Sequence, residues 1–185
     1  MSARVCPWWL GWLLASPIRK LRHDPARILA PHVREGMTVL EPGPGMGFFT
    51  LELARRVGPA GRVIAVDLQP RMLAGLRRRA ERAGLVGRVV TRLAAKDSLG
   101  AADLAGAVNF VLAFAVVHEL PDAARFFAEI RATLAPGGKV LLAEPAGHVK
   151  PADFEASLAA AARAGLRREP GPTIPRSLTA LLAAT

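Results

Sequence analysis

The sequence predicts an α/β protein with a doubly wound, seven-stranded, mostly parallel sheet whose last strand runs antiparallel. Two observations support this class. From Met37 onward, short β-branched or aliphatic runs alternate with helical patterns, which is typical of parallel sheets. Near the end of the chain, two further strand-like runs are separated by a short Pro/Gly loop. A loop this short favours antiparallel pairing of the strands that it joins.

The predicted elements follow one another along the chain in the order expected for this class. Runs rich in Val, Leu and Ile predict strands over residues 38–41, 62–67, 89–93, 109–114, 139–144, 166–169 and 177–182. Helical patterns predict helices over residues 47–57, 70–83, 122–134 and 152–164. Pro70 suits the first position of a helix. Pro136 stops the third helix, and Gly137 and Gly138 predict the turn before the fifth strand.

Size and composition predict one globular domain. The chain has 185 residues, of which 51% are hydrophobic and 22% charged, so it can bury a core without disulfides or metals. We expect a single domain over 1–185, made of an N-terminal helical lid segment (1–35) and a core (36–185). The only cysteine, Cys6, cannot form an internal disulfide, which favours a reducing, cytoplasmic location. No Cys/His cluster predicts a metal site.

The formal net charge of +10 would attract nucleic acid or an anionic membrane. Arginine, however, accompanies abundant Ala, Gly and Pro throughout the chain, as a GC-rich coding sequence would give. The densest basic run contains Arg77, Arg78, Arg79 and Arg82 on an amphipathic pattern. We interpret this run as a solvated helix face.

An apolar stretch at residues 5–15 follows Arg4. It is too short to span a bilayer. Pro7 and three tryptophans argue against a cleaved signal peptide, so we expect a short helix that stays attached. Three roles remain open for its tryptophans: covering the substrate site, forming a homodimer contact, or making a peripheral membrane contact.

A glycine-rich loop is the strongest local signal. In VLEPGPGMGFFT a predicted strand ends at Glu41, and Gly43, Gly45 and Gly47 follow at every second position before a helix. Glycines let the backbone pass close to a ligand, and a helix N-terminus favours a carboxylate or phosphate. A dinucleotide-binding GxGxxG loop would need its third glycine where Phe48 stands. The loop instead has the GxGxG pattern, preceded by an acid, of enzymes that use S-adenosylmethionine (SAM).

The second predicted strand ends in Asp67, about twenty residues beyond the loop, where an acid can accept both ribose hydroxyls of a nucleotide-like ligand. Both NAD and SAM need that contact. Asp67 alone would also suit a helix cap, because Pro70 begins the next helix shortly afterwards. Its spacing from the glycine loop favours cofactor binding.

A resemblance to class I SAM-dependent methyltransferases becomes specific at LAPGGKVLLAEP, which resembles the turn and fifth strand of that family. EPGPGMG, VIAVD and NFVLAFAVVHEL precede it in the family's order and spacing. The resemblance extends over residues 30–144 and is strongest to the subgroup that includes ubiquinone and menaquinone biosynthesis methyltransferases. It implies the Rossmann-like fold of the family, SAM as cofactor and S-adenosylhomocysteine (SAH) as product.

The resemblance also implies a cofactor site, carried over position by position. The loop from Glu41 to Gly47 should contact the methionine part of SAM, Asp67 the ribose, and Leu68 the adenine. The segment 95–97 should border the adenine edge, and the backbone at residues 113–114 should approach the methionine amine. The full set is Glu41, Gly43, Pro44, Gly45, Gly47, Asp67, Leu68, Ala95, Lys96, Asp97, Ala113 and Phe114. Family members often have an acid in place of Ala95 and an aspartate in place of Asn109.

His118 and Glu119 are the catalytic candidates. They follow the fourth predicted strand at the carboxyl edge of the sheet, where α/β proteins bind ligands. His118 suits either of two roles: accepting a proton from a substrate hydroxyl or amine, or positioning the substrate by a hydrogen bond. Glu144 ends the fifth strand, and we favour a cap or an arginine partner for it over a pocket role.

Three alternatives to a small-molecule methyltransferase remain open. A NAD-dependent oxidoreductase shares the loop and the later acid, but the chain has no Tyr, which excludes the catalytic tyrosine of short-chain dehydrogenases. An RNA-directed methyltransferase suits the charge, but AFAVVHEL stands where enzymes acting on base amines typically have DPPY or NPPY. The third alternative is a non-catalytic SAM-binding protein. We therefore expect a small-molecule acceptor and do not expect nucleic acid as a partner.

Overall fold

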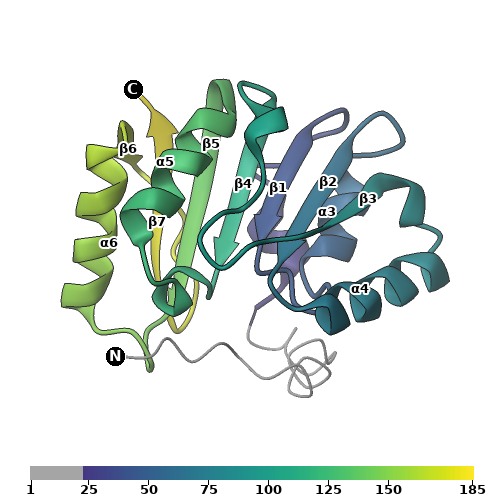
Figure 1. Ribbon diagram of the computed structural model, residues 1–185, viewed down its shortest axis with the longest axis horizontal. Coiled ribbons are helices and arrows are strands. Elements are labelled where there is room, and N and C mark those ends of the chain that lie inside the picture. Colours follow the sequence, from purple (N-terminus) through teal and green to yellow (C-terminus); the bar gives the residue numbers. More distant parts are fainter. Residues whose placement is uncertain (1–22) are drawn as a thin grey trace.

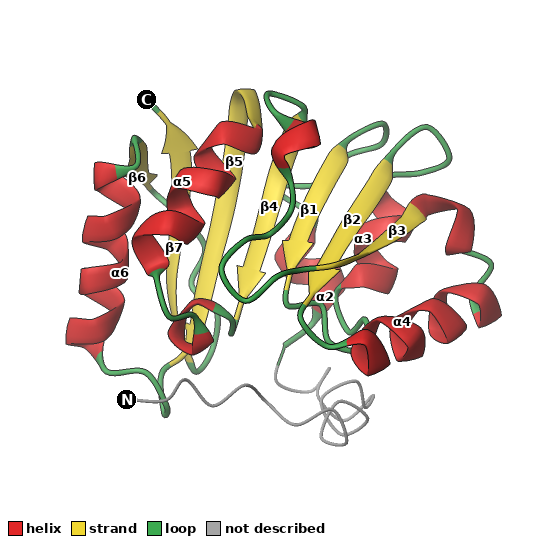
Figure 2. Cartoon of the chain, in the orientation of Figure 1, coloured by secondary structure: helices red, strands yellow, loops and turns green. Residues whose placement is uncertain are grey.

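The computed structural model describes residues 23–185, which form a seven-stranded sheet in the order β3-β2-β1-β4-β5-β7-β6. Figures 1 and 2 show this sheet with helices on both of its faces. The strands are β1 (Thr38–Pro42), β2 (Arg62–Asp67), β3 (Val89–Leu93), β4 (Val108–Phe114), β5 (Leu134–Pro145), β6 (Leu166–Glu169) and β7 (Ser177–Ala184). The predicted doubly wound sheet is confirmed.

Strands β1 to β5 pair in parallel, so their carboxyl ends meet at one edge of the sheet. β7 pairs antiparallel with both β5 and β6, which confirms the antiparallel last strand. The strand order reverses at β1, because β2 and β3 lie on one side of it and β4 and β5 on the other. Ligands of open α/β sheets bind at the carboxyl edge beside such a reversal.

Successive side chains of each central strand point to opposite faces of the sheet, so the core is divided between two layers. Leu40, Val111 and Leu142 face one layer, which includes α5 (Ala123–Thr133) and α6 (Pro151–Arg163). Their neighbours in sequence face the other layer, with α2 (Pro25–Leu29) and α3 (Thr50–Arg56). α4 (Pro70–Arg82) packs against β2 and β3. This burial on both faces explains why the central strands are almost continuously apolar.

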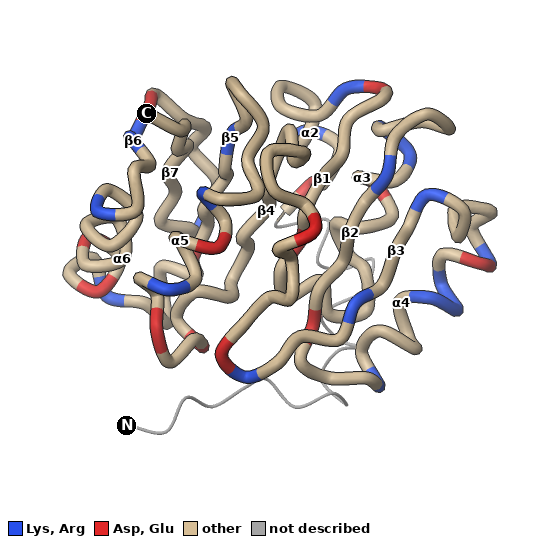
Figure 3. The backbone as a smooth tube through the Cα atoms, turned by 45° about the horizontal axis from the view of Figure 1, so that its top comes forward, with Lys and Arg blue, Asp and Glu red and all other residues tan. Residues whose placement is uncertain are grey.

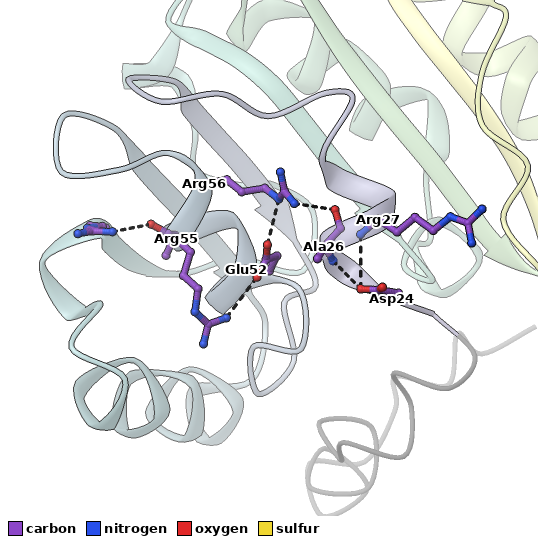
Figure 4. Close-up of polar contacts among 8 residues, drawn as sticks. Asp24, Ala26, Arg27, Glu52, Arg55 and Arg56 are labelled. Carbon is purple, nitrogen blue, oxygen red and sulfur yellow. Dashed lines mark hydrogen bonds and ion pairs between the residues drawn. The ribbon is translucent and has the colours of Figure 1, made fainter.

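The described part of the predicted lid segment belongs to the α3 layer. Asp24 caps α2 by accepting hydrogen bonds from the backbone N–H groups of Ala26 and Arg27. Arg56 of α3 donates to the carbonyl of Ala26 and pairs with Glu52 at 3.0 Å (Figure 4). The predictions of a lid, a dimer contact or a membrane contact through the tryptophans concern residues outside the described range.

Two predicted boundaries differ from the structure by three residues or more. The helix expected from residue 47 begins at Thr50, because Gly47 has a φ of +85°, which a right-handed helix does not allow. β5 was expected from residue 139, but it begins at Leu134. Leu134 already pairs with Val108, and the register shifts before Lys139 pairs with Phe110. The expected Pro/Gly turn is therefore an irregularity within the strand.

Asn109 has a structural contact at the amino end of the sheet. Its Oδ1 accepts the backbone N–H of Thr38 at 2.8 Å, which joins β4 to β1. An aspartate would offer the same acceptor, so this departure from the family pattern leaves that contact available.

Basic residues lie along α4 and also on β6 and α6 at the other end of the sheet (Figure 3). In the described part of the chain, they therefore occur on several elements. No helix within residues 23–185 is both long enough and apolar enough to cross a bilayer.

Candidate active site

A cavity of about 590 Å³ opens at the carboxyl edge of the sheet. Its walls come from the loops that follow the five parallel strands, together with the first turns of α4 and α5. Parallel pairing brings these loops together although they are far apart in sequence. The cavity is therefore a consequence of the topology, and it lies where the sequence predicted a site.

The glycine loop after β1 forms one wall. Gly43, Pro44 and Gly45 line the cavity, whereas Gly47 does not. A Cβ atom added to Gly45 would meet nothing within 4 Å, so its Cα faces open space. A Cβ added to Gly47 would lie 2.4 Å from Cδ1 of Leu76, a fully buried residue of α4. Gly45 thus allows a ligand to approach, and Gly47 allows α4 to pack closely.

We expect Gly45→Ala and Gly47→Ala to fail in different ways. Both glycines have positive φ values, +55° and +85°, so both variants carry a similar backbone strain of roughly 1 kcal/mol. Gly47→Ala must also displace Leu76, at a further cost of about 1 to 3 kcal/mol. Gly45→Ala should instead weaken SAH binding by roughly tenfold. Thermal unfolding and calorimetric titration with SAH measure the two effects, and equal unfolding temperatures would contradict the packing role.

Asp67 closes β2 and lines the cavity beside the glycine loop. The pKa of its carboxyl group is raised to about 6, mainly by burial and to a smaller extent by nearby Glu119. Backbone N–H groups of Gln69, Gly45 and Leu68 oppose this shift by stabilising the charged form, and the Gln69 N–H lies 2.9 Å from Oδ1. The carboxylate is thus held rigidly in a half-buried position where ligand hydroxyls can reach it.

The segment after β3 forms the next wall. Ala95, Lys96 and Asp97 line the cavity, as does Leu68 from the loop after β2. Ala95 and Ser98 form an isolated antiparallel bridge, so this segment is a tight turn. The predicted adenine edge therefore lies beside the predicted ribose acid.

Two residues of α5 hold this turn against the sheet. Arg125 pairs with Asp97 at 3.4 Å, and Glu129 accepts the backbone N–H of Leu99 at 2.8 Å. Asp97 is therefore engaged by an arginine. No local pattern identified Arg125 or Glu129 as site residues, because both lie on an ordinary amphipathic helix.

The remaining predicted cofactor residues divide into two groups. Phe114 lines the main cavity. Glu41 is buried and lines a much smaller adjoining cavity, which Phe114 and Gly43 also line. Ala113 is fully buried in the core, and of its two neighbours in sequence only Phe114 lines the main cavity. Glu41 and Ala113 therefore lie behind the wall of the main cavity.

His118 and Glu119 lie in a short 3-10 helix, η5 (Val117–Glu119), and both line the cavity. His118 Nε2 lies 4.0 Å from Glu119 Oε1. On its other side, His118 Nδ1 lies 2.5 Å from Glu144 Oε2. The hydrogen bond to Glu144 raises the pKa of His118 above its usual value, while partial burial opposes the shift. The imidazole is thus held between two carboxylates.

His148 lines this end of the cavity, and the buried Glu144 lies behind it. The favoured role for Glu144 was right in part: it pairs with no arginine among the described residues, but it accepts the backbone N–H of Val117, the first residue of η5, and it also pairs with His118. His148 lines the cavity with its ring centroid 5.1 Å from that of His118. Within residues 23–185, no group of three or more His, Cys, Asp or Glu is arranged to hold a metal ion.

Comparison with known sequences shows the class of proteins to which this fold and cavity belong. Residues 39–138, more than half of the chain, match the methyltransferase domain family. The chain therefore belongs to the methyltransferase domain family. The fold is that of class I SAM-dependent methyltransferases, and SAM rather than NAD is the cofactor of this family.

Two curated relatives are similar over part of their length. An arsenite methyltransferase of Halobacterium salinarum is 36% identical over 109 residues, which are 59% of this chain and 27% of that protein. A ubiquinone/menaquinone biosynthesis C-methyltransferase of Pasteurella multocida is 31% identical over 112 residues, which are 60% of this chain and 41% of that protein. The chain thus spans less than half of either relative.

A crystal structure of a SAM-dependent methyltransferase from Aquifex aeolicus has the same fold over nearly all of both chains. The TM-score is 0.84, with 97% of this chain and 98% of that chain covered. The sequence identity is 22%, so this likeness concerns the fold.

Proposed function

We propose that this chain transfers a methyl group from SAM to a small-molecule acceptor bound beside His118. The observation that carries the proposal is that Asp67, the open face of Gly45 and the His118 imidazole all face one cavity. A cofactor held by the first two would therefore lie in the same cavity as an acceptor held by the third, next to it. We also propose that the chain is a single domain and that it is located in the cytoplasm.

The residues around the cavity fit the cofactor. A hydroxylated ribose needs an acceptor such as the Asp67 carboxylate, and a ligand that passes close to the backbone needs the open face of Gly45. Apolar side chains surround both, including Leu68, Met72 and Phe126. We assign the ribose to Asp67, the methionine part to residues 43–45 and Phe114, and the adenine to Leu68 and the turn at 95–97. Glu41, Gly47 and Ala113 would support this wall from behind.

SAM supplies an electrophilic methyl group on a positively charged sulfur. The protein's own contribution is alignment and exclusion of water, which need no covalent nucleophile. Held by Asp67 and residues 43–45, SAM would supply the methyl carbon to the acceptor atom, and the electron pair of the broken carbon–sulfur bond would remain on sulfur. Nε2 of His118 takes the proton that the acceptor loses, and Glu144 stabilises the resulting imidazolium. Glu119, whose Oε1 lies 4.0 Å from Nε2, is a second carboxylate that stabilises this positive charge.

The residues that line the cavity, and not the activities of the relatives, are the basis for proposing a small-molecule acceptor. Those names mention arsenite and ubiquinone or menaquinone biosynthesis. The family match ends at residue 138, before Pro145 and His148, which line the His118 end of the cavity. The apolar residues Phe48 and Val116 also line the cavity. We expect an acceptor small enough for a partly apolar cavity and bearing a hydrogen-bonding O–H or N–H group.

Incubating the purified chain with methyl-labelled SAM and separate fractions of small metabolites, lipids and RNA tests the proposal. We expect label to enter the small-metabolite fraction with the wild-type protein and far less with Asp67→Asn. Label in RNA would overturn the small-molecule acceptor. SAH binding without transfer to any fraction would instead favour the non-catalytic alternative.

A further inference from the structure

Glu144 is almost completely buried, with 2% of its surface exposed, yet it forms no ion pair with lysine or arginine among the described residues. Its Oε1 accepts the backbone N–H of Val117 at 2.7 Å. Its Oε2 lies 2.5 Å from Nδ1 of His118. Both carboxylate oxygens therefore serve the short helix that carries the imidazole into the cavity. Burying a carboxylate is costly unless its hydrogen bonds are made, and these two contacts satisfy that requirement.

The backbone explains how Glu144 reaches this helix. β4 and β5 pair as far as Phe114 and Ala143, so Glu144 is the next residue along β5. On the β4 side the chain turns away at Ala115, whose φ of +56° is unusual for a residue with a side chain. The Ala115 N–H still donates to the carbonyl of Ala143 at 2.7 Å. The turn therefore begins at a fixed point and brings Val117 and His118 over Glu144.

An ionised carboxylate only accepts hydrogen bonds, so the Nδ1 atom of His118 must carry the hydrogen that lies between them. A neutral imidazole carries one N–H, and its other nitrogen then has a free lone pair. In His118 that nitrogen is Nε2, at the opposite side of the ring from Glu144. The contact with Glu144 therefore decides which nitrogen can accept a proton.

We propose that Glu144 is a positioning residue that keeps neutral His118 in its Nδ1–H tautomer, leaving Nε2 as the proton acceptor in the cavity. The tautomer itself requires neither SAM nor an acceptor. Its use in catalysis rests on the proposed function, with one proton passing from the acceptor to Nε2 in each turnover. Glu144 acts through His118 and through the Val117 N–H, and it takes no proton itself.

Other ionisable groups around the imidazole are consistent with this role. Glu119 lies beside Nε2 on the same short helix, and His148 packs edge to face against the ring from the loop after β5. Asp67, which also lines the cavity, is close enough to Glu119 to interact electrostatically with it. Both carboxylates nearest to His118 favour its protonated form, so the imidazole is a stronger base than free histidine.

The wild-type protein provides the first test. Proton–nitrogen NMR of ¹⁵N-histidine-labelled protein, above the His118 pKa and without SAM, shows which ring nitrogen carries the hydrogen. We expect the Nδ1–H form for His118. The Nε2–H form, or rapid exchange between both forms, would overturn the proposal. Because no ligand is present, this result does not depend on whether the chain is a methyltransferase.

Glu144→Gln provides the second test, with the exposed surface residue Glu155 replaced by glutamine as the matched control. If the amide oxygen keeps the Val117 N–H, its NH₂ group faces Nδ1 and reverses the tautomer. We expect the Nε2–H form, a His118 pKa lower by about 1 unit or more, and unchanged SAH affinity. The wild-type tautomer in a folded Glu144→Gln protein would contradict the proposal, as would the same changes in the control.

A double-variant comparison connects the tautomer with turnover once an acceptor is known. Glu144→Gln should lower kcat by at least about a hundredfold in wild-type protein, because the proton acceptor is lost. The same substitution should have little further effect on kcat in His118→Gln protein, because residues that act as a unit are not additive. Full additivity of the two losses would show that Glu144 acts independently of His118.

Discussion

His118→Ala is expected to lower turnover by at least about a hundredfold while leaving SAH affinity nearly unchanged. The imidazole lies between Glu144 and Glu119 in the wall of the cavity. Its removal takes away the proton acceptor but leaves the glycine loop and Asp67 in place. Steady-state kinetics with the acceptor found in the labelling experiment, together with SAH titration, measure the two quantities separately.

His118→Gln separates catalysis from positioning. Glutamine retains a donor for Glu144 but cannot take a proton near neutral pH. A general base predicts a fall in kcat in both variants, whereas a positioning role predicts a rise in KM that glutamine partly rescues. A His118→Ala protein with the wild-type rate would show that the imidazole is structural.

Turnover should also depend on pH through His118. Only the neutral imidazole accepts a proton, so wild-type turnover should fall as the pH drops through the His118 pKa. Because Glu144 raises that pKa above 6.5, the fall should begin at a higher pH than for free histidine. The alanine variant should lose this limb of the profile, and retention of the limb would assign it to another group.

Asp67→Asn is expected to weaken SAH binding by roughly 10-fold to 100-fold, since it replaces charge-assisted hydrogen bonds with neutral ones. Calorimetric titration at pH 8 measures the loss. The control is Asp103→Asn, which removes a surface carboxylate paired with Arg92 and far more exposed than Asp67. Unchanged SAH affinity in Asp67→Asn would contradict the ribose assignment.

The same substitution should make the ligand-free protein more stable at pH 7. Burial raises the pKa of Asp67 from 3.8 to about 6, so folding disfavours its charged form. That cost is absent below pH 3.8 and grows as the pH rises towards 6. Removing the charge should stabilise the folded state by about 1 to 2 kcal/mol, after allowing for partial exposure. Thermal unfolding without ligand measures the gain, and a lower unfolding temperature would contradict it.

SAH affinity of the wild-type protein should rise with pH through about 6, because ribose hydroxyls donate to the ionised carboxylate of Asp67. Asp67→Asn should lose this dependence. Titrations at pH 5 and pH 8 compare the two proteins, and the same dependence in both would assign it to a different group.

Local sequence patterns were sufficient for the sheet and for most of the cavity. Continuous apolar runs predict buried parallel strands, and such strands bring the loops after Glu41, Asp67 and Phe114 to one edge whatever the details of packing. Gly43, Gly45 and Asp67 were therefore identifiable from position and residue type. The sequence alone did not distinguish Gly47 from these residues, because glycine is needed there to leave room for Leu76, which lies on another helix.

The contact between Glu144 and His118 was beyond the reach of local patterns. It depends on the register of β4 and β5 and on the turn at Ala115, which join residues 26 positions apart. The same applies to Glu129, which holds the turn before Leu99 from 30 positions away. Both acids lie in segments whose local sequence predicts only a strand end or a helix face.

A crystal structure of the protein with SAH would show directly whether the cofactor lies in the cavity at the carboxyl edge of the sheet, which His118 also lines. We predict the ribose hydroxyls on the Asp67 carboxylate, the methionine part along residues 43–45, and the sulfur facing the His118 end. SAH bound outside this cavity, or with its ribose away from Asp67 and its sulfur away from His118, would contradict the proposed methyl transfer in this cavity.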